Sequence, residues 1–277
     1  MRHRSVLVAL FPLCVAGDPA ALGAQPDSSV NLTFFRPTDL LWVGGFALAS
    51  YGVSRFDPRI AQYFQRPQAQ DDAGKRNFAE NFTKLQETSL TLAGIATYGI
   101  GKLSKSRTVA DIGLHVTEAV VAASVTSQII RGPLGRSRPE VTNFEDQYDF
   151  RPFAGFTEFK YRAFPSIHTS SSFAAATVLT LETARRNPRA TWVVAPISYV
   201  LASTPAYSRM YLGQHWASDI FMGAFFGIFY GARVVDYSHD HPDNRFDRFF
   251  LGRVPTDGIR LDYRGGRGAT FSYGLTF

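Results

Sequence analysis

Six uncharged stretches, each rich in Ala, Leu, Val and Phe, constrain the fold of this chain more than any other feature. Their lengths and polar flanks are typical of helices. A chain of 277 residues can bury a large core, and six such helices predict an all-α bundle. The predicted helices contain residues 40–54, 88–101, 119–130, 169–181, 190–208 and 220–232.

The lengths of these stretches also bear on whether the helices cross a membrane. A spanning helix needs roughly 20 apolar residues, and residues 190–208 alone approach that length, with two prolines among them. The third stretch is preceded by Asp111, His115 and Glu118, which are unfavourable in hydrocarbon. The mean hydropathy lies slightly below zero. These features favour a soluble or peripheral bundle over an integral one.

Residues 1–24 have the pattern of a secretory signal peptide. A basic start at Arg2 and Arg4 is followed by an apolar stretch that is too short to span a bilayer. Small residues then lead to Ala24, where we predict cleavage after export to the periplasm or cell envelope. Cys14, the sole cysteine, lies in this segment, so the mature chain has no thiol for a disulfide or a metal.

The rest of the chain divides into a helical domain, residues 25–237, and a C-terminal tail, residues 238–277. Within the domain, residues 25–38 and 56–77 are polar and predict loops. The tail begins with a polar stretch, residues 238–257, that we expect to be irregular. Apolar residues then alternate with polar or small ones on both sides of a Gly-rich segment, which predicts a β-hairpin. The alternating apolar residues are Ile259, Leu261, Tyr263, Phe271, Tyr273, Leu275 and Phe277.

The formal net charge of +6 favours anionic partners, whether phosphates or acidic lipid headgroups. The basic residues are scattered rather than gathered in one run, which disfavours nucleic acid. We therefore expect a phosphorylated small molecule or a lipid phosphate as the partner. The protein could also contact a membrane surface or be embedded in a membrane.

A first cluster of polar residues follows the third helical stretch. Arg131, Arg136 and Arg138 lie there in a turn rich in Gly and Pro. Guanidiniums are planar donors suited to tetrahedral oxyanions such as phosphate. Taken alone, the cluster is better explained as a basic loop at a helix C-terminus, where cations complement the helix dipole. Arg136 is out of phase with the other two, and we expect it to be a cation at the rim.

Two further clusters open predicted helices. Ser166 and His168 begin the fourth helix, where a cap is the simplest interpretation, although free N–H groups at a helix N-terminus also bind anions. Arg209, His215 and Asp219 lead into the sixth helix. Residues four apart share one helix face, so the carboxylate can accept the imidazole Nδ1–H and leave Nε2 bare as nucleophile or base.

Taken together, the three clusters resemble a known signature. The order Arg-x6-Arg-Pro, Pro-Ser-x-His and Ser-Arg-x5-His-x3-Asp, from Arg131 to Asp219, is similar to that of the type 2 phosphatidic acid phosphatase superfamily. This superfamily also contains class A acid phosphatases and vanadium-dependent haloperoxidases. The resemblance implies a six-helix bundle core of that type, and metal-independent hydrolysis of phosphomonoesters, among them lipid phosphates such as phosphatidic acid.

The resemblance also implies roles for individual residues. His215 would attack phosphorus to form a phosphohistidine, His168 would act as general acid and base, and Asp219 would orient the nucleophile. Fixed cations replace a catalytic metal, so we expect no metal and no cofactor, with vanadate as an inhibitor. The phosphate-binding groups would be Arg131, Arg138, Ser166, the backbone N–H of Ile167 and Arg209.

The sequence departs from the family pattern at two positions. Arg131 replaces the usual Lys, which keeps the positive charge but replaces a compact ammonium with a planar guanidinium that has several donors. Ile167 replaces the usual Gly, and we expect its branched side chain to restrict the backbone and crowd the entrance. This departure leaves a catalytically impaired phosphate-binding envelope protein as an alternative, and a vanadate-dependent haloperoxidase is a second one.

Other polar and aromatic residues have simpler interpretations. Residues 239–243 contain two His and two Asp, but we expect a solvated loop there rather than a metal site. His115 is expected to be a buried or interhelical histidine. Tyr207, Tyr211 and Trp216 flank the third motif and are expected to pack in the core, or to form a wall of a pocket for the leaving group.

Overall fold

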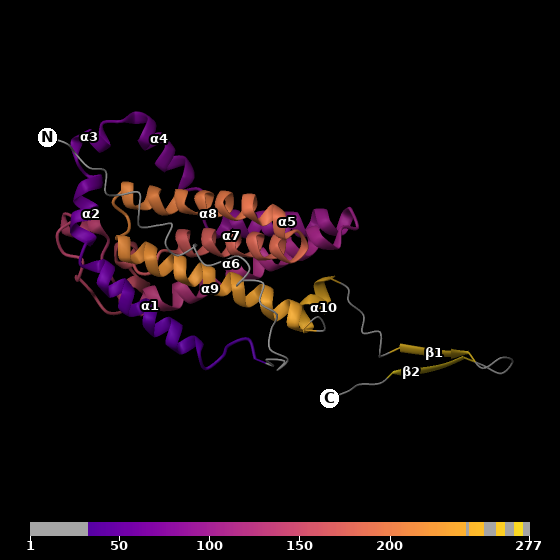
Figure 1. Cartoon of the computed structure of the whole chain (residues 1–277). Helices are drawn as coiled ribbons and strands as arrows, with labels where there is room; N and C mark the ends of the chain where they lie inside the picture. The colour runs from indigo at the N-terminus through magenta and orange to yellow at the C-terminus, as the bar shows by residue number, and fades with distance from the viewer. Residues whose placement is uncertain (1–32, 242–243, 252–258, 264–268, 274–277) are drawn as a thin grey trace.

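The computed structural model describes residues 33–241, 244–251, 259–263 and 269–273 (Figure 1). These residues form a bundle of helices, followed by one pair of strands. The predicted signal peptide, with Cys14, lies outside the described residues.

Each of the six predicted stretches lies within a long helix, which confirms the all-α prediction. Each helix extends beyond its stretch into polar or charged neighbours, and the five from α5 onward run side by side in Figure 1. The six long helices are α1 (Asp39–Ser54), α5 (Glu87–Leu103), α6 (Arg107–Leu134), α7 (Ile167–Arg186), α8 (Pro188–Tyr211) and α9 (Ala217–Asp240).

The loop prediction for residues 56–77 was wrong, because most of this segment is helical. Pro58 and Pro67 lie in the first turns of two short helices, where a missing N–H costs nothing. Asp72 caps a third helix by accepting bonds from two backbone N–H groups. Phe64 is buried against α8, a tertiary contact that polar composition does not reveal. The short helices are α2 (Asp57–Phe64), α3 (Pro67–Gln70) and α4 (Ala73–Phe82).

The tail is more regular than predicted. Helix α9 continues to Asp240, and α10 (Arg245–Leu251) follows it, so residues 238–257 are not irregular throughout. Strands β1 (Ile259–Tyr263) and β2 (Ala269–Tyr273) pair antiparallel. Residues 264–268, between the strands, lie outside the described residues.

Helix α7 packs against α6, α8 and α9, and its contact with α9 is unusually close. Gly223, Gly227 and Gly231 recur every four residues on the face of α9 that meets α7. A Cβ added at Gly227 would lie 2.5 Å from the carbonyl oxygen of Ser170, and one at Gly223 would lie 2.6 Å from that of Ser166. The small residues therefore bring the N-terminus of α7 against the N-terminus of α9.

We expect Gly227→Ala to lower the free energy of unfolding by about 1–3 kcal/mol, because the added methyl group forces α7 away from α9. Gly99→Ala on α5 is the matched control, since nothing lies within 4 Å of its added Cβ. The control should be neutral or stabilise the helix by up to about 1 kcal/mol. Unfolding of both variants in one detergent measures the difference, and equal effects would contradict the close packing.

Large apolar side chains are exposed on the outward faces of α1, α5, α6 and α8. Leu41 on α1 is 77% exposed, Leu103 on α5 is 87% exposed and Trp192 on α8 is 70% exposed. Val125 and Ile129 continue this surface on α6. By length and composition, α6 and α9 could each cross a membrane. An apolar surface of this extent is characteristic of proteins that contact lipid or another protein.

Candidate functional site

The three motifs meet at one end of the bundle. Arg131 lies in the last turn of α6 and Arg209 in the last turn of α8, at the end where α7 and α9 begin. His168 is the second residue of α7, and His215 lies in the connection from α8 to α9. The two imidazoles are near enough to interact electrostatically with each other, and both interact with the same three guanidiniums, the third being Arg138.

The three guanidiniums form a buried cradle with free donors. Arg131, Arg138 and Arg209 are 7%, 3% and 7% exposed. Each keeps at least one buried side-chain nitrogen that has no hydrogen-bond partner among the described residues. Arg138 lies over the ring of Phe159 at 3.9 Å, and Arg209 donates one bond to Thr83 at 3.3 Å. Buried cations with free donors are costly unless an anion binds them, so this arrangement suits an oxyanion.

The N-terminus of α7 adds neutral groups beside the cradle. Ser166 is the buried N-cap, and its hydroxyl accepts a bond from Thr169 at 3.1 Å, which leaves its own proton free to donate. Ile167 is the first helical residue, whose backbone N–H has no intrahelical partner. Its side chain is enclosed by protein, with 1% exposed.

Asp219 holds His215 by a route that differs from the prediction. The spacing predicts both residues on one helix face, but His215 precedes α9, whose N-cap is Trp216. Asp219 instead turns back from the first turn of α9, where its Oδ2 accepts the N–H of Trp216 at 2.8 Å. The same oxygen lies 3.4 Å from Nδ1 of His215. The expected contact therefore exists, made by a helix cap.

Burial and the positive charges of Arg209, Arg138 and Arg131 lower the pKa of His215 well below its usual value. The shift favours the neutral form of the imidazole. With Nδ1 facing Asp219, the ring can present the lone pair of Nε2 as a nucleophile.

Arg136 was predicted to be a rim cation, and this prediction was wrong. Its side chain is buried, with 3% exposed, and it joins three segments of the chain. The guanidinium donates to Asp219 at 2.5 Å, to the Ser218 hydroxyl at 2.8 Å and to Asp57 at 2.9 Å. The phase argument failed because helix α6 ends at Gly135, which turns the chain with φ +62.

Asp57 is the residue of this site that the sequence analysis missed. It begins α2, is fully buried, and accepts bonds from both the backbone N–H and the hydroxyl of Ser218. Burial raises its pKa to about 6, although Arg136 and the bonds from Ser218 oppose the shift. An Asp directly before Pro58 is a helix-start signal, but its spacing gives no connection to the three motifs.

We expect Arg136→Met to lower the free energy of unfolding by about 3–5 kcal/mol, because it leaves Asp57 and Asp219 as buried carboxylates without their shared cation. Arg151→Met is the control, since that side chain is 60% exposed and its ion pair with Asp149 spans 3.6 Å. The control should change stability by less than about 1 kcal/mol. Chemical unfolding of both variants measures the effect. An unchanged stability of Arg136→Met would support the original prediction that Arg136 is a cation at the rim.

A helical bundle whose helix ends surround one oxyanion site with guanidiniums and imidazoles has the features of the phosphatase superfamily that the motifs resemble. Residues 112–242 match the family model described as the PAP2 superfamily. This segment contains all three motifs, so the match agrees with the resemblance that the motifs predicted.

The chain is also similar to three curated proteins, each named lipid A 1-phosphatase. It is 41% identical over 69 residues to the protein of Porphyromonas gingivalis, which is 25% of this chain and 15% of that protein. It is 27% identical over 147 residues to that of Rhizobium johnstonii, covering 51% of this chain and 55% of the relative. It is 28% identical over 144 residues to that of Rhizobium etli, covering 50% of this chain and 57% of the relative. The alignments thus cover at most 57% of the length of these relatives.

Among solved structures, a transmembrane PAP2-type phosphatidylglycerolphosphate phosphatase from Bacillus subtilis matches with a TM-score of 0.40 and 18% identity. The match covers 71% of this chain and 98% of that protein.

Proposed function

We propose that this protein is a phosphatase that hydrolyses phosphomonoesters through a phosphohistidine formed on His215. The observation that carries the proposal is the cradle of three buried arginines, which keep unpartnered nitrogens and whose charges act on both imidazoles. The match of residues 112–242 to the PAP2 superfamily supports the same class of reaction.

In the first step, Nε2 of His215 attacks phosphorus and the bond from phosphorus to the ester oxygen breaks. His168 gives a proton to the departing oxygen, and Asp219 stabilises the imidazole as it becomes positive. Arg131, Arg138 and Arg209 neutralise the charge that builds on the phosphoryl oxygens. Because these cations are fixed parts of the fold, the proposed reaction requires no metal in the catalytic site.

In the second step, His168 takes a proton from a water molecule as that water attacks the phosphohistidine. The bond from phosphorus to Nε2 breaks, inorganic phosphate leaves, and His215 returns to its neutral form. Ser166 and the first N–H groups of α7 serve both steps as neutral donors to the phosphoryl oxygens.

The substrate that we propose is a phosphomonoester carried by a lipid, with a lipid A 1-phosphate as the first candidate because of the three relatives. The exposed apolar faces of α1, α5, α6 and α8 support contact with acyl chains. At 1.5 Å per residue, α6 is about 42 Å long, which exceeds the roughly 30 Å hydrocarbon core of a bilayer. We therefore propose an embedded bundle, with the phosphate site at one membrane surface, in place of the soluble or peripheral one that hydropathy favoured.

An open groove between α4 and α8 supplies room for the leaving group. Its volume is about 610 Å³, and Lys75, Phe78, Val200 and Tyr207 are among the residues that line it. Arg209 lies on the same helix as Tyr207 and bonds to Thr83, the C-cap of α4, so the groove and the cradle share two helices. We propose that the sugar or acyl part of the substrate enters along this groove.

We expect His215→Ala to lose at least about 10³-fold in phosphate release, because it removes the nucleophile. Purified protein with EDTA should hydrolyse p-nitrophenyl phosphate, phosphatidic acid and lipid A, with micromolar vanadate as an inhibitor. Arg151→Met should keep wild-type rates, since this side chain lies on the surface. Turnover that survives in His215→Ala would refute the assigned nucleophile, and bromide oxidation with vanadate and peroxide would favour a haloperoxidase instead.

The lowered pKa of His215 predicts the acid side of the pH profile. The neutral ring is present above this pKa, so kcat/KM should fall only when the pH drops well below 6.5. Arg209→Gln removes one cation that lowers this pKa, and its acid limb should move to higher pH. Profiles with p-nitrophenyl phosphate measure both limbs, and an unshifted limb in Arg209→Gln would exclude titration of His215 as its cause.

A further inference from the structure

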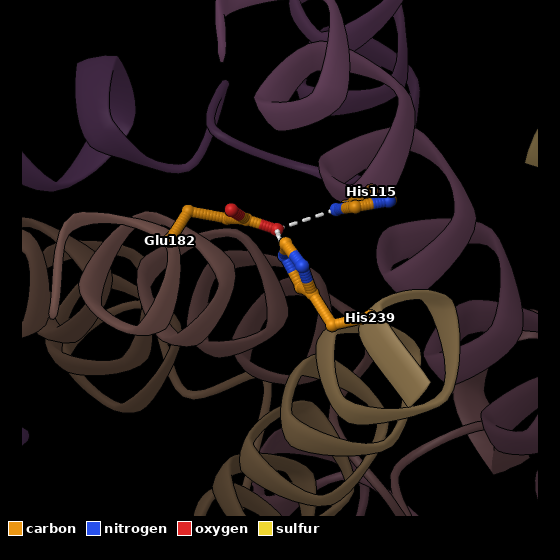
Figure 2. A group of neighbouring side chains, drawn as sticks. All are labelled: His115, Glu182 and His239. Carbon is orange, nitrogen blue, oxygen red and sulfur yellow. Dashed lines mark hydrogen bonds and ion pairs between the residues drawn. The ribbon is translucent and has the colours of Figure 1, made fainter. Parts of the chain in front are cut away.

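A second cluster of ionisable side chains is buried far from the phosphate site. His115 and Glu118 lie on α6, Glu182 on α7, His239 on α9 and Asp247 on α10. Figure 2 shows the side chains of His115 and His239, each from a different helix, meeting the carboxylate of Glu182. Along α6, His115 is about 24 Å from Arg131 at 1.5 Å per residue, so the two sites lie toward opposite ends of the bundle.

Several polar atoms of this cluster have no hydrogen-bond partner among the described residues. They are Nε2 of His115, Oε1 of Glu118 and both carboxylate oxygens of Asp247. The side chains of His115 and Asp247 are each 1% exposed, and Nε2 of His115 lies 3.8 Å from Asp247, beyond hydrogen-bond distance. Buried carboxylates without donors cost free energy, so a positive charge shared by these three side chains would stabilise them.

These atoms lie close enough together to bind one metal ion. One ligand atom from each of His115, Glu118 and Asp247 lies within 4.8 Å of the others. His115 and Glu118 are three residues apart on one face of α6, and α10 brings Asp247 to them. With the imidazole in the neutral form that metal binding requires, the two carboxylates balance the charge of a divalent cation, and this ligand set suits zinc.

The other nitrogen of His115 is already held in the manner of a metal ligand. Its Nδ1 lies 2.6 Å from Oε1 of Glu182, and that carboxylate also binds His239 at 3.0 Å and Arg186. A carboxylate on Nδ1 fixes the proton there and turns the lone pair of Nε2 toward the metal. The alternative group of His115, Glu182 and His239 is less suitable, because its ligand atoms already satisfy one another.

We propose that His115 Nε2, Glu118 and Asp247 bind one divalent transition-metal ion, with zinc as the fitting species, at the end of the bundle remote from the phosphate site. Glu182 orients His115 from behind. The ion fastens α10 to α6 and so ties the start of the C-terminal tail to the helical bundle. Its role is structural, and the proposed phosphatase chemistry does not pass through it.

The test uses the purified full chain, treated with chelator, then titrated with zinc alone. We expect one zinc per chain by elemental analysis and a higher melting temperature with zinc. Asp247→Asn and the nearly isosteric Glu118→Gln should each lose the bound zinc and the thermal shift. Asp236→Asn is the matched control, because that carboxylate forms a surface ion pair with Arg185 and should keep both.

Two further outcomes would overturn the proposal. Absence of bound zinc, with a melting temperature that the chelator does not change, would show that the carboxylates are neutralised by protons or by an imidazolium. Zinc lost in His239→Asn but kept in Asp247→Asn would assign the metal to the other group of ligands. Phosphate release is measured separately, and a metal-free chain with full activity would leave the proposed function intact.

Discussion

The ion pair between Arg136 and Asp219 is the interaction on which the site depends. Asp219 uses one oxygen for Arg136 and the other for the Trp216 backbone and His215, so a single carboxylate caps α9, faces the candidate nucleophile and anchors the loop that follows α6. Arg136 in turn binds Asp57, which draws α2 onto the same end of the bundle. Without this pair, two buried carboxylates would repel each other, and three segments would lose their common contact.

The glycines of α9 complete the arrangement because they allow α7 and α9 to approach each other closely. Where α7 and α9 nearly touch, Ser166 donates its backbone N–H to the carbonyl of Asp219 at 3.1 Å, so the N-termini of the two helices are bonded directly. The first N–H groups of α7 are left without intrahelical partners at this end of the bundle, where the three arginines also lie. The end of the bundle that contains the candidate site is thus polar and charged, whereas the outward faces of α1, α5, α6 and α8 are apolar, in agreement with the membrane contact that we propose.

The predictions from sequence succeeded where a local pattern has a local cause. Apolar stretches located all six long helices, because an uncharged stretch of this length and composition favours a helix whether its apolar side chains meet protein or lie on the outer surface. The motif residues from Arg131 to Asp219 lie at one end of the bundle, and their roles in binding and catalysis stay a prediction. Asp57 and the role of Arg136 could not be predicted, since their meeting depends on how α2 folds back over a distance of 79 residues. The helices in residues 56–77 were not predicted for the same reason, because contacts with the distant helix α8 stabilise them.

The sequence by itself determined the class of fold and the order of the long helices, and it predicted which residues bind phosphate. These properties follow from hydrophobic periodicity, helix signals and the chemistry of each side chain, which depend on the local sequence and not on distant contacts. Tertiary structure alone decided which charges are buried and which partners they have: Arg136 inside rather than at the rim, His215 held by a helix cap, and His115 facing two carboxylates without a donor. Burial and pairing depend on segments that are distant in sequence, and electrostatic free energies depend steeply on both.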